Sequence, residues 1–305
     1  MSNQSVLVIG GSGMIGAHIC AHLKTQGWDV TVGSRRVDPT VEPDSIHELP
    51  RLSGDYTAKG FTVEELRGFD SVVMAAGQDI RHIAQDEENE QFWDKAQRVS
   101  IPALAQRAKE AGVRRFVQIG SYYHQLLPML AEDNAYVRAR RDADNLTRLL
   151  SDDAFAAITL NPPSIVGAAT NRDVRRYEKM AAWLRGEKSN NVWAPAGGTN
   201  YMSVRSLAQA VAGALERGEG GRAYLIGDES LTFKEFFQRI VQASGSQVEL
   251  PIREEEHPLL PDRFIVQGRG KQIDYEPDPE QVQLLGYDRF DVTRALTEIL
   301  QSSSP

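Results

Sequence analysis

A glycine-rich turn near the N-terminus constrains this 305-residue chain more than any other feature. The short apolar run from Ser5 to Ile9 leads into Gly10, Gly13 and Gly16, and the following stretch AHICAHLKTQG has the periodicity of an amphipathic helix. Glycines between a strand and a helix let the backbone turn sharply, approach a pyrophosphate and pack the helix against the sheet. The pattern therefore predicts a βαβ unit whose helix N-terminus binds the phosphates of a dinucleotide.

The alternation of strand and helix continues to residue 167. Short apolar runs predict strands at 28–33, 69–77, 115–121 and 156–160, and helical spacing predicts helices at 101–111 and 136–150. The first of these helices is entered through Pro102 and closed by Gly112. We expect an α/β protein with a doubly wound parallel sheet of the Rossmann type, whose ligands bind at the carboxyl ends of the strands.

The regular alternation stops after Gly167. A cationic helix and a loop rich in Gly, Pro and Asn extend to about residue 200, a helix is expected at 201–217, and a strand at 222–227 rejoins the sheet. We expect a further helix at 231–244, a loop-rich stretch and a final helix at 292–300. The predicted domains are a dinucleotide-binding domain over 1–167, with 201–227 returning to it, and a smaller substrate lobe from 168–200 and 228–305.

Charge and cysteine content limit the classes of partner. The 34 basic and 42 acidic residues give a net charge of -8, which repels phosphate backbones and anionic membrane surfaces, so we expect neither nucleic acid nor membrane as a partner. No apolar stretch approaches the roughly 20 residues that span a bilayer. With Cys20 as the one cysteine and no HExxH motif, we expect no metal site and a cytoplasmic location.

The end of the second strand bears on which dinucleotide is bound. An acidic side chain there accepts a hydrogen bond from the ribose 2'-hydroxyl of NAD(H), whereas arginine accommodates the 2'-phosphate of NADP(H). The sequence is Gly33-Ser34-Arg35-Arg36, and two guanidinium groups can grip a phosphate through bidentate hydrogen bonds. NADP(H) is the favoured cofactor. NAD(H) is the alternative, with Asp38 as the residue that reaches the ribose and the arginines as solvated surface charge.

Several further motifs occur in a fixed order along the chain. They are GGSGMIG at 10–16, Asp55-Tyr56, Ala75-Ala76-Gly77, the strand-end Ser121, Tyr136 four residues before Arg140, and LNPPSIVG at 160–167. Together they resemble the short-chain dehydrogenase/reductase superfamily in its extended or atypical branch, often labelled NAD-dependent epimerase/dehydratase-like. The resemblance and the strand-end arginines imply that the cofactor is bound by Gly10, Ser12, Gly13, Met14, Ile15, Gly16, Ser34, Arg35, Arg36, Asp55, Tyr56, Ala75, Ala76, Gly77, Tyr136, Arg140, Pro163 and Ile165.

The same resemblance implies a catalytic group of Ser121, Tyr136 and Arg140. In the family the tyrosine exchanges a proton with the carbonyl oxygen, the serine binds that oxygen, and a lysine at i+4 lowers the tyrosine pKa from about 10 and holds the nicotinamide ribose. Arg140 stands in place of this lysine and keeps the positive charge, but it does not release a proton. Ser100 stands where many relatives have an asparagine.

Three functions follow from these residues. The first is an NADP(H)-dependent reductase or dehydrogenase of a small metabolite, working as a possible homodimer. The second is a nucleotide-sugar epimerase or dehydratase, although no Thr-Asp-Glu trio follows Ser121 and Ser164 and Val166 replace the usual Asn and Tyr. The third is a non-catalytic NADP(H)-sensing protein, in which Tyr136 is a packed helix residue and Ser121 caps a turn.

Overall fold

The computed structural model describes residues 4–36, 38, 40–78, 80 and 90–301, and the chain divides into two compact units. The first unit comprises Met1–Pro162, Leu207–Ile226 and Asp278–Tyr287, and the second comprises Pro163–Ser206, Gly227–Pro277 and Asp288–Pro305. Segments 163–167 and 201–206, which the sequence analysis places in the first domain, thus belong to the second unit. Segment 278–287, placed in the substrate lobe, belongs to the first.

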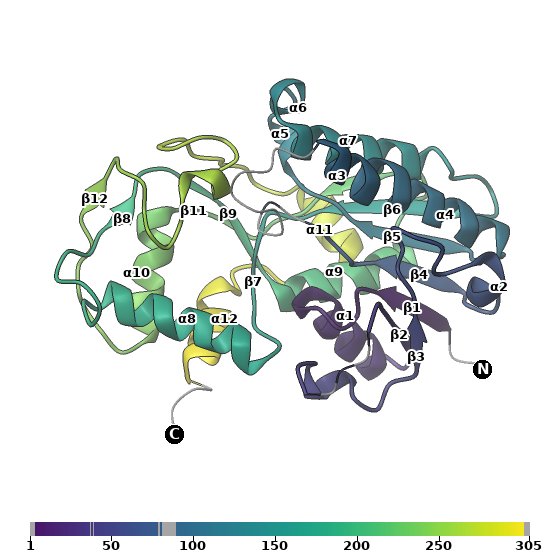
Figure 1. The fold of residues 1–305 in the computed structure, drawn as a ribbon, viewed down its shortest axis with the longest axis horizontal. Helices are drawn as coiled ribbons and strands as arrows, with labels where there is room; N and C mark the ends of the chain where they lie inside the picture. Colours follow the sequence, from purple (N-terminus) through teal and green to yellow (C-terminus); the bar gives the residue numbers. More distant parts are fainter. Residues whose placement is uncertain (1–3, 37, 39, 79, 81–89, 302–305) are drawn as a thin grey trace. The chain divides into compact units, whose positions relative to one another are not determined.

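A parallel sheet of seven strands forms the centre of the first unit (Figure 1). Its order is β10-β6-β5-β4-β1-β2-β3, and every neighbouring pair is parallel. The strands are β1 (Ser5–Ile9), β2 (Asp29–Ser34), β3 (Arg51–Ser53), β4 (Ser71–Met74), β5 (Arg115–Ile119), β6 (Ala156–Asn161) and β10 (Ala223–Leu225). The predicted doubly wound Rossmann-type sheet is confirmed. Strand order reverses between β1 and β4, the position where such sheets bind ligands.

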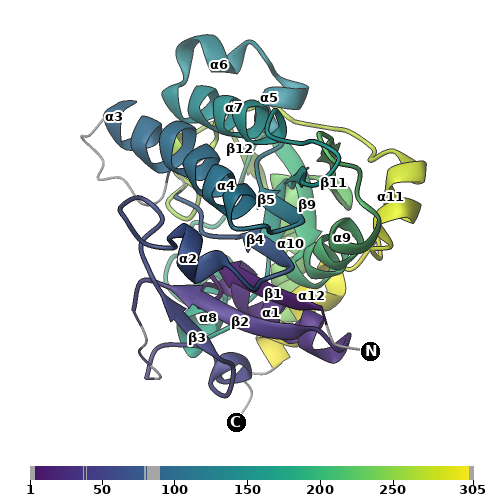
Figure 2. The same cartoon turned by 90° about the vertical axis from the view of Figure 1, so that its right-hand side faces the viewer.

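Helices cover both faces of this sheet (Figures 1 and 2). Helices α2 (Val63–Leu66), α4 (Ser100–Glu110) and α7 (Ala135–Arg148) lie on one face, and α1 (Met14–Thr25) and α9 (Val204–Arg217) lie on the other. The other helices in the described part of this unit are η1 (Asp44–Ile46), α3 (Glu90–Trp93), the π-helix η3 (Asp94–Val99), α5 (Tyr123–Leu126), α6 (Leu130–Asp133) and α11 (Pro279–Leu285). The sequence analysis predicts α1, α4 and α7 to within a few residues.

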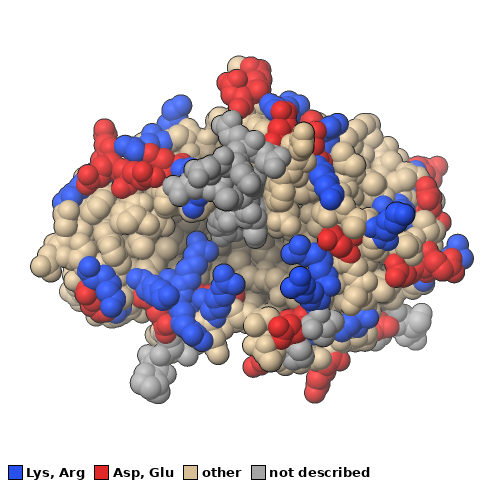
Figure 3. Space-filling view, in the orientation of Figure 1, with Lys and Arg blue, Asp and Glu red and all other residues tan. Residues whose placement is uncertain are grey.

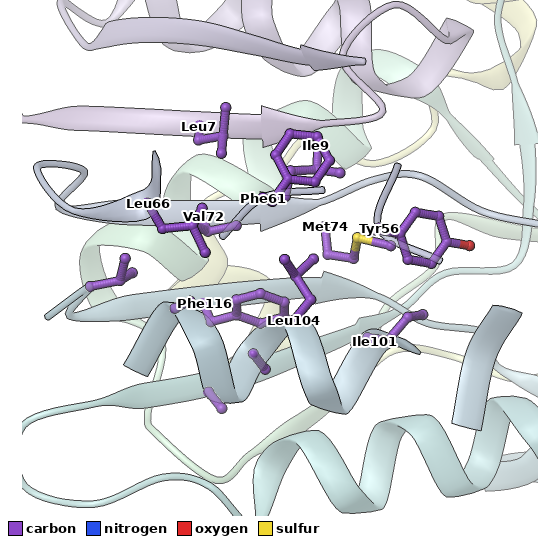
Figure 4. Close-up of a cluster of buried hydrophobic side chains, with 14 of the residues drawn as sticks. Leu7, Ile9, Tyr56, Phe61, Leu66, Val72, Met74, Ile101, Leu104 and Phe116 are labelled. Atoms are coloured by element: carbon purple, nitrogen blue, oxygen red, sulfur yellow. The ribbon is translucent and has the colours of Figure 1, made fainter. Parts of the chain in front are cut away.

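The core of the first unit explains why this pattern folds (Figure 4). Leu7 and Ile9 are two residues apart on β1, so their side chains point to the same face of the sheet. On that face they belong to one cluster with Phe116 of β5 and with Ile101 and Leu104 of α4. All five are at most 1% exposed. Full burial of such side chains stabilises the unit by about 1.5–3 kcal/mol each. The strands therefore read as continuous apolar runs because both of their faces are covered.

The second unit has a smaller sheet of its own, with strand order β11-β9-β7. Strand β9 (Gly198–Ser203) pairs antiparallel with β11 (Glu229–Thr232) and parallel with β7 (Ser164–Val166). The unit also holds α8 (Asn171–Leu184), α10 (Phe233–Ala243), α12 (Val292–Gln301), the strand pair β8 (Ala194–Pro195) and β12 (Ile252–Arg253), and η4 (Asp262–Phe264). Among the described residues, no helix combines the length and the apolar character that crossing a bilayer would require.

Two predicted helices start later in the structure than the sequence pattern indicates, and several short helices, α11 among them, were not predicted. Residues 201–203 belong to β9 and 231–232 to β11, because these strands pair with each other before either helix begins. The hydroxyl of Ser203 accepts from the Ser206 amide at 3.0 Å, and that of Thr232 accepts from the Glu235 amide at 3.1 Å, so each strand ends in a helix cap. Helix α11 lies in the stretch predicted to be loop-rich.

Candidate active site

The glycine turn that follows β1 is held in place by contacts with the ends of β2 and β4. The Gly10 amide donates to the Gly33 carbonyl of β2 at 2.8 Å, and Gly10 has φ +84°, a conformation that favours glycine. A Cβ on Gly10 would lie 2.4 Å from the Ala76 nitrogen, and a Cβ on Gly16 would lie 2.1 Å from the Gly10 carbonyl oxygen. Both positions therefore exclude any side chain, and the backbone itself lines the turn.

The N-terminus of α1 fits an anionic group. Gly13 is the N-cap, and no described side chain caps the helix or places an acidic residue in its first turn. The first amide groups of a helix have no partner inside it and carry a positive partial charge. Ser12, Met14 and Ile15 are half-buried beside this end, so their backbone can face a pyrophosphate.

The residues after β2 carry free positive charge. Arg35 and Arg36 are exposed and form no ion pair with any described residue, while the Ser34 hydroxyl donates to the Arg36 carbonyl at 2.8 Å. The carboxylate of Asp38, the alternative ribose ligand, accepts from both the amide and the hydroxyl of Thr40, at 3.1 and 2.6 Å. The strand end thus presents two guanidinium groups and a carboxylate of which one oxygen is hydrogen-bonded to Thr40.

Unpaired arginines are a minority among the arginines that the structure describes. Nearly every other described arginine has a carboxylate, carbonyl or aromatic partner. Besides Arg35 and Arg36, the arginines for which the described part of the structure provides no such partner are Arg172, Arg175 and Arg176 of α8. The free cations after β2 are therefore a specific feature and not the rule for this surface.

Asp55 and Tyr56 follow β3 at the same edge of the sheet. The Asp55 carboxylate accepts from the amide and the hydroxyl of Thr57, at 2.9 and 2.8 Å. Burial raises the pKa of Asp55, but these two hydrogen bonds and the charge of Arg35 together hold it below its usual value. Tyr56 is buried, which raises its pKa to about 12, and its hydroxyl points away from the core cluster (Figure 4).

Arg140 lies where β4 and β5 end. Its Nη1 donates to the Ile119 carbonyl at 3.3 Å, and its Nη2 lies 3.6 Å from the position that a Cβ on Gly77 would take. Ala75 lies two residues before Gly77, and its amide donates to the Ile9 carbonyl at 2.9 Å, which continues the pairing of β4 with β1. Arg140 is 7% exposed, and its Nε has no hydrogen-bond partner among the described residues.

Tyr136 and Ser121 lie in the same unit as Arg140. The Arg140 guanidinium carbon is 5.4 Å from the centre of the Tyr136 ring, one helical turn before it, and Trp93 contacts the ring edge-on at 4.9 Å. Ser121 follows β5 directly, and its amide donates to Asn161 Oδ1 at 2.8 Å. Ser100 is buried at the start of α4. The structure therefore joins Tyr136, Arg140 and the Gly77 backbone at one edge of the sheet.

Two predicted cofactor residues belong to the other unit. Pro163 opens the second unit, and Ile165 lies in β7 opposite Met202, so their contact with a cofactor stays a prediction. Conversely, Gln97 was not predicted, although its side chain donates to the Gln78 carbonyl at 2.9 Å beside Gly77. Gln97 lies in the π-helix η3, where the helical repeat is interrupted, so a search for regular spacing does not select it.

The fold and the glycine turn define a Rossmann-type protein with the enzyme-like fold of NAD-dependent oxidoreductases and epimerases. The chain belongs to the NAD dependent epimerase/dehydratase family, whose pattern matches residues 6–227. It is 27% identical over 167 residues to an uncharacterized chloroplastic protein of Arabidopsis thaliana. That match covers 55% of this chain and 52% of the relative, so it spans about half the length of that protein.

Solved structures share the fold over nearly the whole chain. The UDP-N-acetylglucosamine 4-epimerase from Methanobrevibacter ruminantium M1, in complex with UDP-N-acetylmuramic acid, has a TM-score of 0.75 and 15% identity, covering 99% of this chain and 98% of that one. The UDP-glucuronic acid 4-epimerase from Bacillus cereus, in complex with NAD, has a TM-score of 0.72 and 15% identity, covering 98% and 99%. At these identities the likeness is one of fold.

Proposed function

We propose that the chain is an NADP(H)-dependent oxidoreductase that reduces a carbonyl group, or oxidises an alcohol, of a small metabolite. The observation that carries the proposal is the buried Arg140 guanidinium, 5.4 Å from the Tyr136 ring and beside the Gly77 backbone. The guanidinium group lies over the ring face, so a cation and a phenol that can exchange a proton share one site. Tyr136 is then the proton donor or acceptor.

The residues divide the chemistry among them. When bound, the nicotinamide ring donates or accepts the hydride. Tyr136 gives its hydroxyl proton to the substrate oxygen in reduction or takes it back in oxidation, and the Ser121 hydroxyl donates a hydrogen bond to the same oxygen. Arg140 places a positive charge against the Tyr136 ring, and because a guanidinium group does not act as a proton relay, its role is electrostatic and orienting.

NADP(H) is proposed over NAD(H) because of the strand end after β2. Arg35 and Arg36 supply two guanidinium groups without an ion-pair partner in the described structure, which suits a 2'-phosphate. One oxygen of the Asp38 carboxylate, which would serve the ribose of NAD(H), already accepts two hydrogen bonds from Thr40. The missing side chains at Gly10 and Gly16 and the uncapped start of α1 accept the pyrophosphate of either dinucleotide.

Replacement of the tyrosine tests the assignment. Tyr136→Phe removes only the hydroxyl, so we expect NADPH-dependent turnover of a carbonyl panel to be lost while NADPH affinity, measured by calorimetric titration, changes less than about twofold. Titration of the wild type with NADH in parallel measures the cofactor preference. A Tyr136→Phe variant with full turnover would exclude this residue as the proton donor.

A nucleotide-sugar epimerase or dehydratase is the second candidate. The family match and the similarity to two UDP-sugar epimerases favour it as much as the reductase. In that case the substrate carries a UDP or dTDP group, and a thermal-shift screen would show strong stabilisation by those nucleotide sugars and none by simple carbonyl compounds. The opposite pattern would favour the reductase.

A non-catalytic NADP(H)-sensing protein is the third candidate, favoured by Arg140 and Ser100 at two positions of the family's catalytic group. If Arg140→Lys creates or greatly raises reductase activity, the catalytic group has lost its function through the change to arginine. If it lowers native turnover, the arginine is suited to the reaction of this chain.

A second copy of the chain is the proposed partner in each case. Leu146 of α7 and Leu149, which caps that helix, are 42% and 79% exposed and supply apolar surface for it.

A further inference from the structure

A fully buried carboxylate lies on α7, one helical turn beyond Arg140 and two beyond Tyr136. Asp144 accepts three side-chain hydrogen bonds: from His124 Nε2 at 2.8 Å, from Arg148 Nε at 2.5 Å and from Asn161 Nδ2 at 3.1 Å. Burial raises the pKa of Asp144, but the hydrogen bonds from His124 and Arg148 outweigh it and hold the pKa below its usual value. Asp144 is therefore a charged group with fixed partners.

Two of these partners hold the turn that carries Ser121. Asn161, the last residue of β6, donates from Nδ2 to Asp144 and accepts the Ser121 amide with its Oδ1 at 2.8 Å. His124 lies three residues after Ser121, on α5, and bonds to the same carboxylate oxygen. Asn161 and His124 thus hold the turn around Ser121, and both bond to Asp144.

The backbone before Ser121 is shaped to admit this arrangement. A Cβ on Gly120 would lie 2.0 Å from Asn161 Oδ1, so only glycine leaves space for the amide group there. A buried charge is expensive compared with an apolar side chain of the same size, unless its hydrogen bonds serve specificity or position. Packing of α7 alone would not require a carboxylate at this point.

We infer that Asp144 is a positioning residue, which fixes the Ser121 turn relative to Tyr136 by holding Asn161 and His124 from the helix that carries the tyrosine. Ser121 follows β5 and Tyr136 lies on α7, and both must reach one substrate oxygen. Asp144 of α7 is connected to the Ser121 turn through the side chains of Asn161 on β6 and His124 on α5. The inference rests on the proposed oxidoreductase function, in which Ser121 and Tyr136 act on the same atom.

The alternative is that the carboxylate only fastens α7 to the sheet. Arg148 separates the two accounts, because it also bonds to Asp144 and to the Gly221 carbonyl, at 3.1 Å, but contacts neither Asn161 nor the Ser121 turn. Its loss should lower stability through the same carboxylate without releasing Ser121. Arg148→Met is therefore the matched control for Asp144→Asn and Asn161→Ala.

The experiment measures three quantities on the full chain: amide hydrogen exchange at Ser121, kcat and KM for a converted carbonyl compound, and NADPH affinity. We expect Asp144→Asn and Asn161→Ala to speed exchange of the Ser121 amide about tenfold or more. They should lower kcat by about 10- to 100-fold, with KM and NADPH affinity changed less than about threefold, since misplacement of a reacting group acts on turnover. Arg148→Met should lower the Tm but retain kcat and the slow exchange.

Two results would overturn the inference. One is an unchanged exchange rate at Ser121 in Asp144→Asn, the variant that removes the charge but leaves Asn161 present to accept the Ser121 amide. The other is a fall in kcat in Arg148→Met as large as in the two test variants, which would show that only stability matters. If the wild type converts no carbonyl or alcohol, the proposed function fails, and the exchange rates alone then decide whether Asp144 holds the Ser121 turn.

Discussion

The backbone at Gly16 leaves no room for a methyl group. A Cβ there would lie 2.1 Å from the Gly10 carbonyl oxygen, whereas a Cβ on Gly13, which has an ordinary φ of -81°, would come no closer than 3.4 Å to the same atom. We expect Gly16→Ala to lower the free energy of unfolding by about 1–3 kcal/mol and Gly13→Ala to change it by less than about 1 kcal/mol. Urea unfolding of the two variants measures the difference, and equal losses would contradict this account of the turn.

Single residues differ in how far a sequence can predict them. Gly10 and Gly16 are predictable because their reason is local: a turn between one strand and the next helix. The environment of Arg140 is not local, because the Ile119 carbonyl and the Gly77 backbone come from two strands that only the assembled sheet brings beside α7. The same holds for Asn161, whose partners Ser121 and Asp144 lie on other elements.

At the scale of elements, the corrected helix boundaries had readable signals. Thr232 and Glu235 form a capping box, with the Thr232 amide donating to the Glu235 carboxylate at 2.7 Å, and this marks the start of α10. Asp278, Pro279 and Gly286 mark the start and the end of α11. A prediction from apolar spacing alone places the helix start too early at a strand–helix junction. The short strand before the helix pairs with residues far away in the sequence, and local spacing does not reveal that pairing.

Helix α8 carries an unfavourable arrangement of charge. Arg172, Arg175, Arg176 and Lys179 lie on its exposed face, and Figure 3 shows Lys and Arg side chains gathered in the region that α8 occupies in Figure 1. Like charges three or four residues apart cost about 0.2–0.5 kcal/mol a pair, and a cation in the first turn opposes the helix dipole. We expect Arg172→Glu to raise the free energy of unfolding by about 0.5–1 kcal/mol, as measured by urea denaturation.

A control on another helix should show the opposite sign. Arg294 of α12 is exposed like Arg172 but pairs with Glu298 at 2.9 Å, so Arg294→Glu replaces an attraction with a repulsion and should lower stability. Both effects should shrink at about 1 M NaCl, where the Debye length is ~3 Å. A stabilisation of Arg172→Glu that persists unchanged in salt would show that charge is not its cause.

For the whole molecule, the two units differ in how much the sequence reveals. The first unit is built mainly of consecutive βαβ steps, each with its own apolar period, so its sheet follows from local pattern and the handedness of the connections. The second unit assembles segments 163–206, 227–277 and 288–305, and in its core Tyr201 stacks on Phe236 at 4.1 Å. Such a core depends on contacts between distant segments, which local periodicity does not encode.

The second unit should also lose stability in mild acid, because it buries a neutral histidine. His257 is 0% exposed; its Nε2 bonds to the Trp193 carbonyl at 3.0 Å, and its Nδ1 accepts from the Leu259 amide at 3.1 Å. Burial lowers the pKa of His257 from 6.5 to about 4. Between these two values the unfolded chain binds a proton that the folded chain does not, so the folded state is favoured less as the pH falls.

The loss expected from His257 begins near pH 6.5 and is complete near pH 4, while above pH 6.5 the group contributes no pH dependence. The difference between the two pKa values corresponds to about 3 kcal/mol. Urea unfolding between pH 7 and pH 4 measures it, with His257→Gln as the control: this variant is less stable at pH 7, because Gln does not reproduce both ring hydrogen bonds, but it should lose about 3 kcal/mol less on acidification. An equal acid-induced loss in wild type and variant would place the titrating group elsewhere.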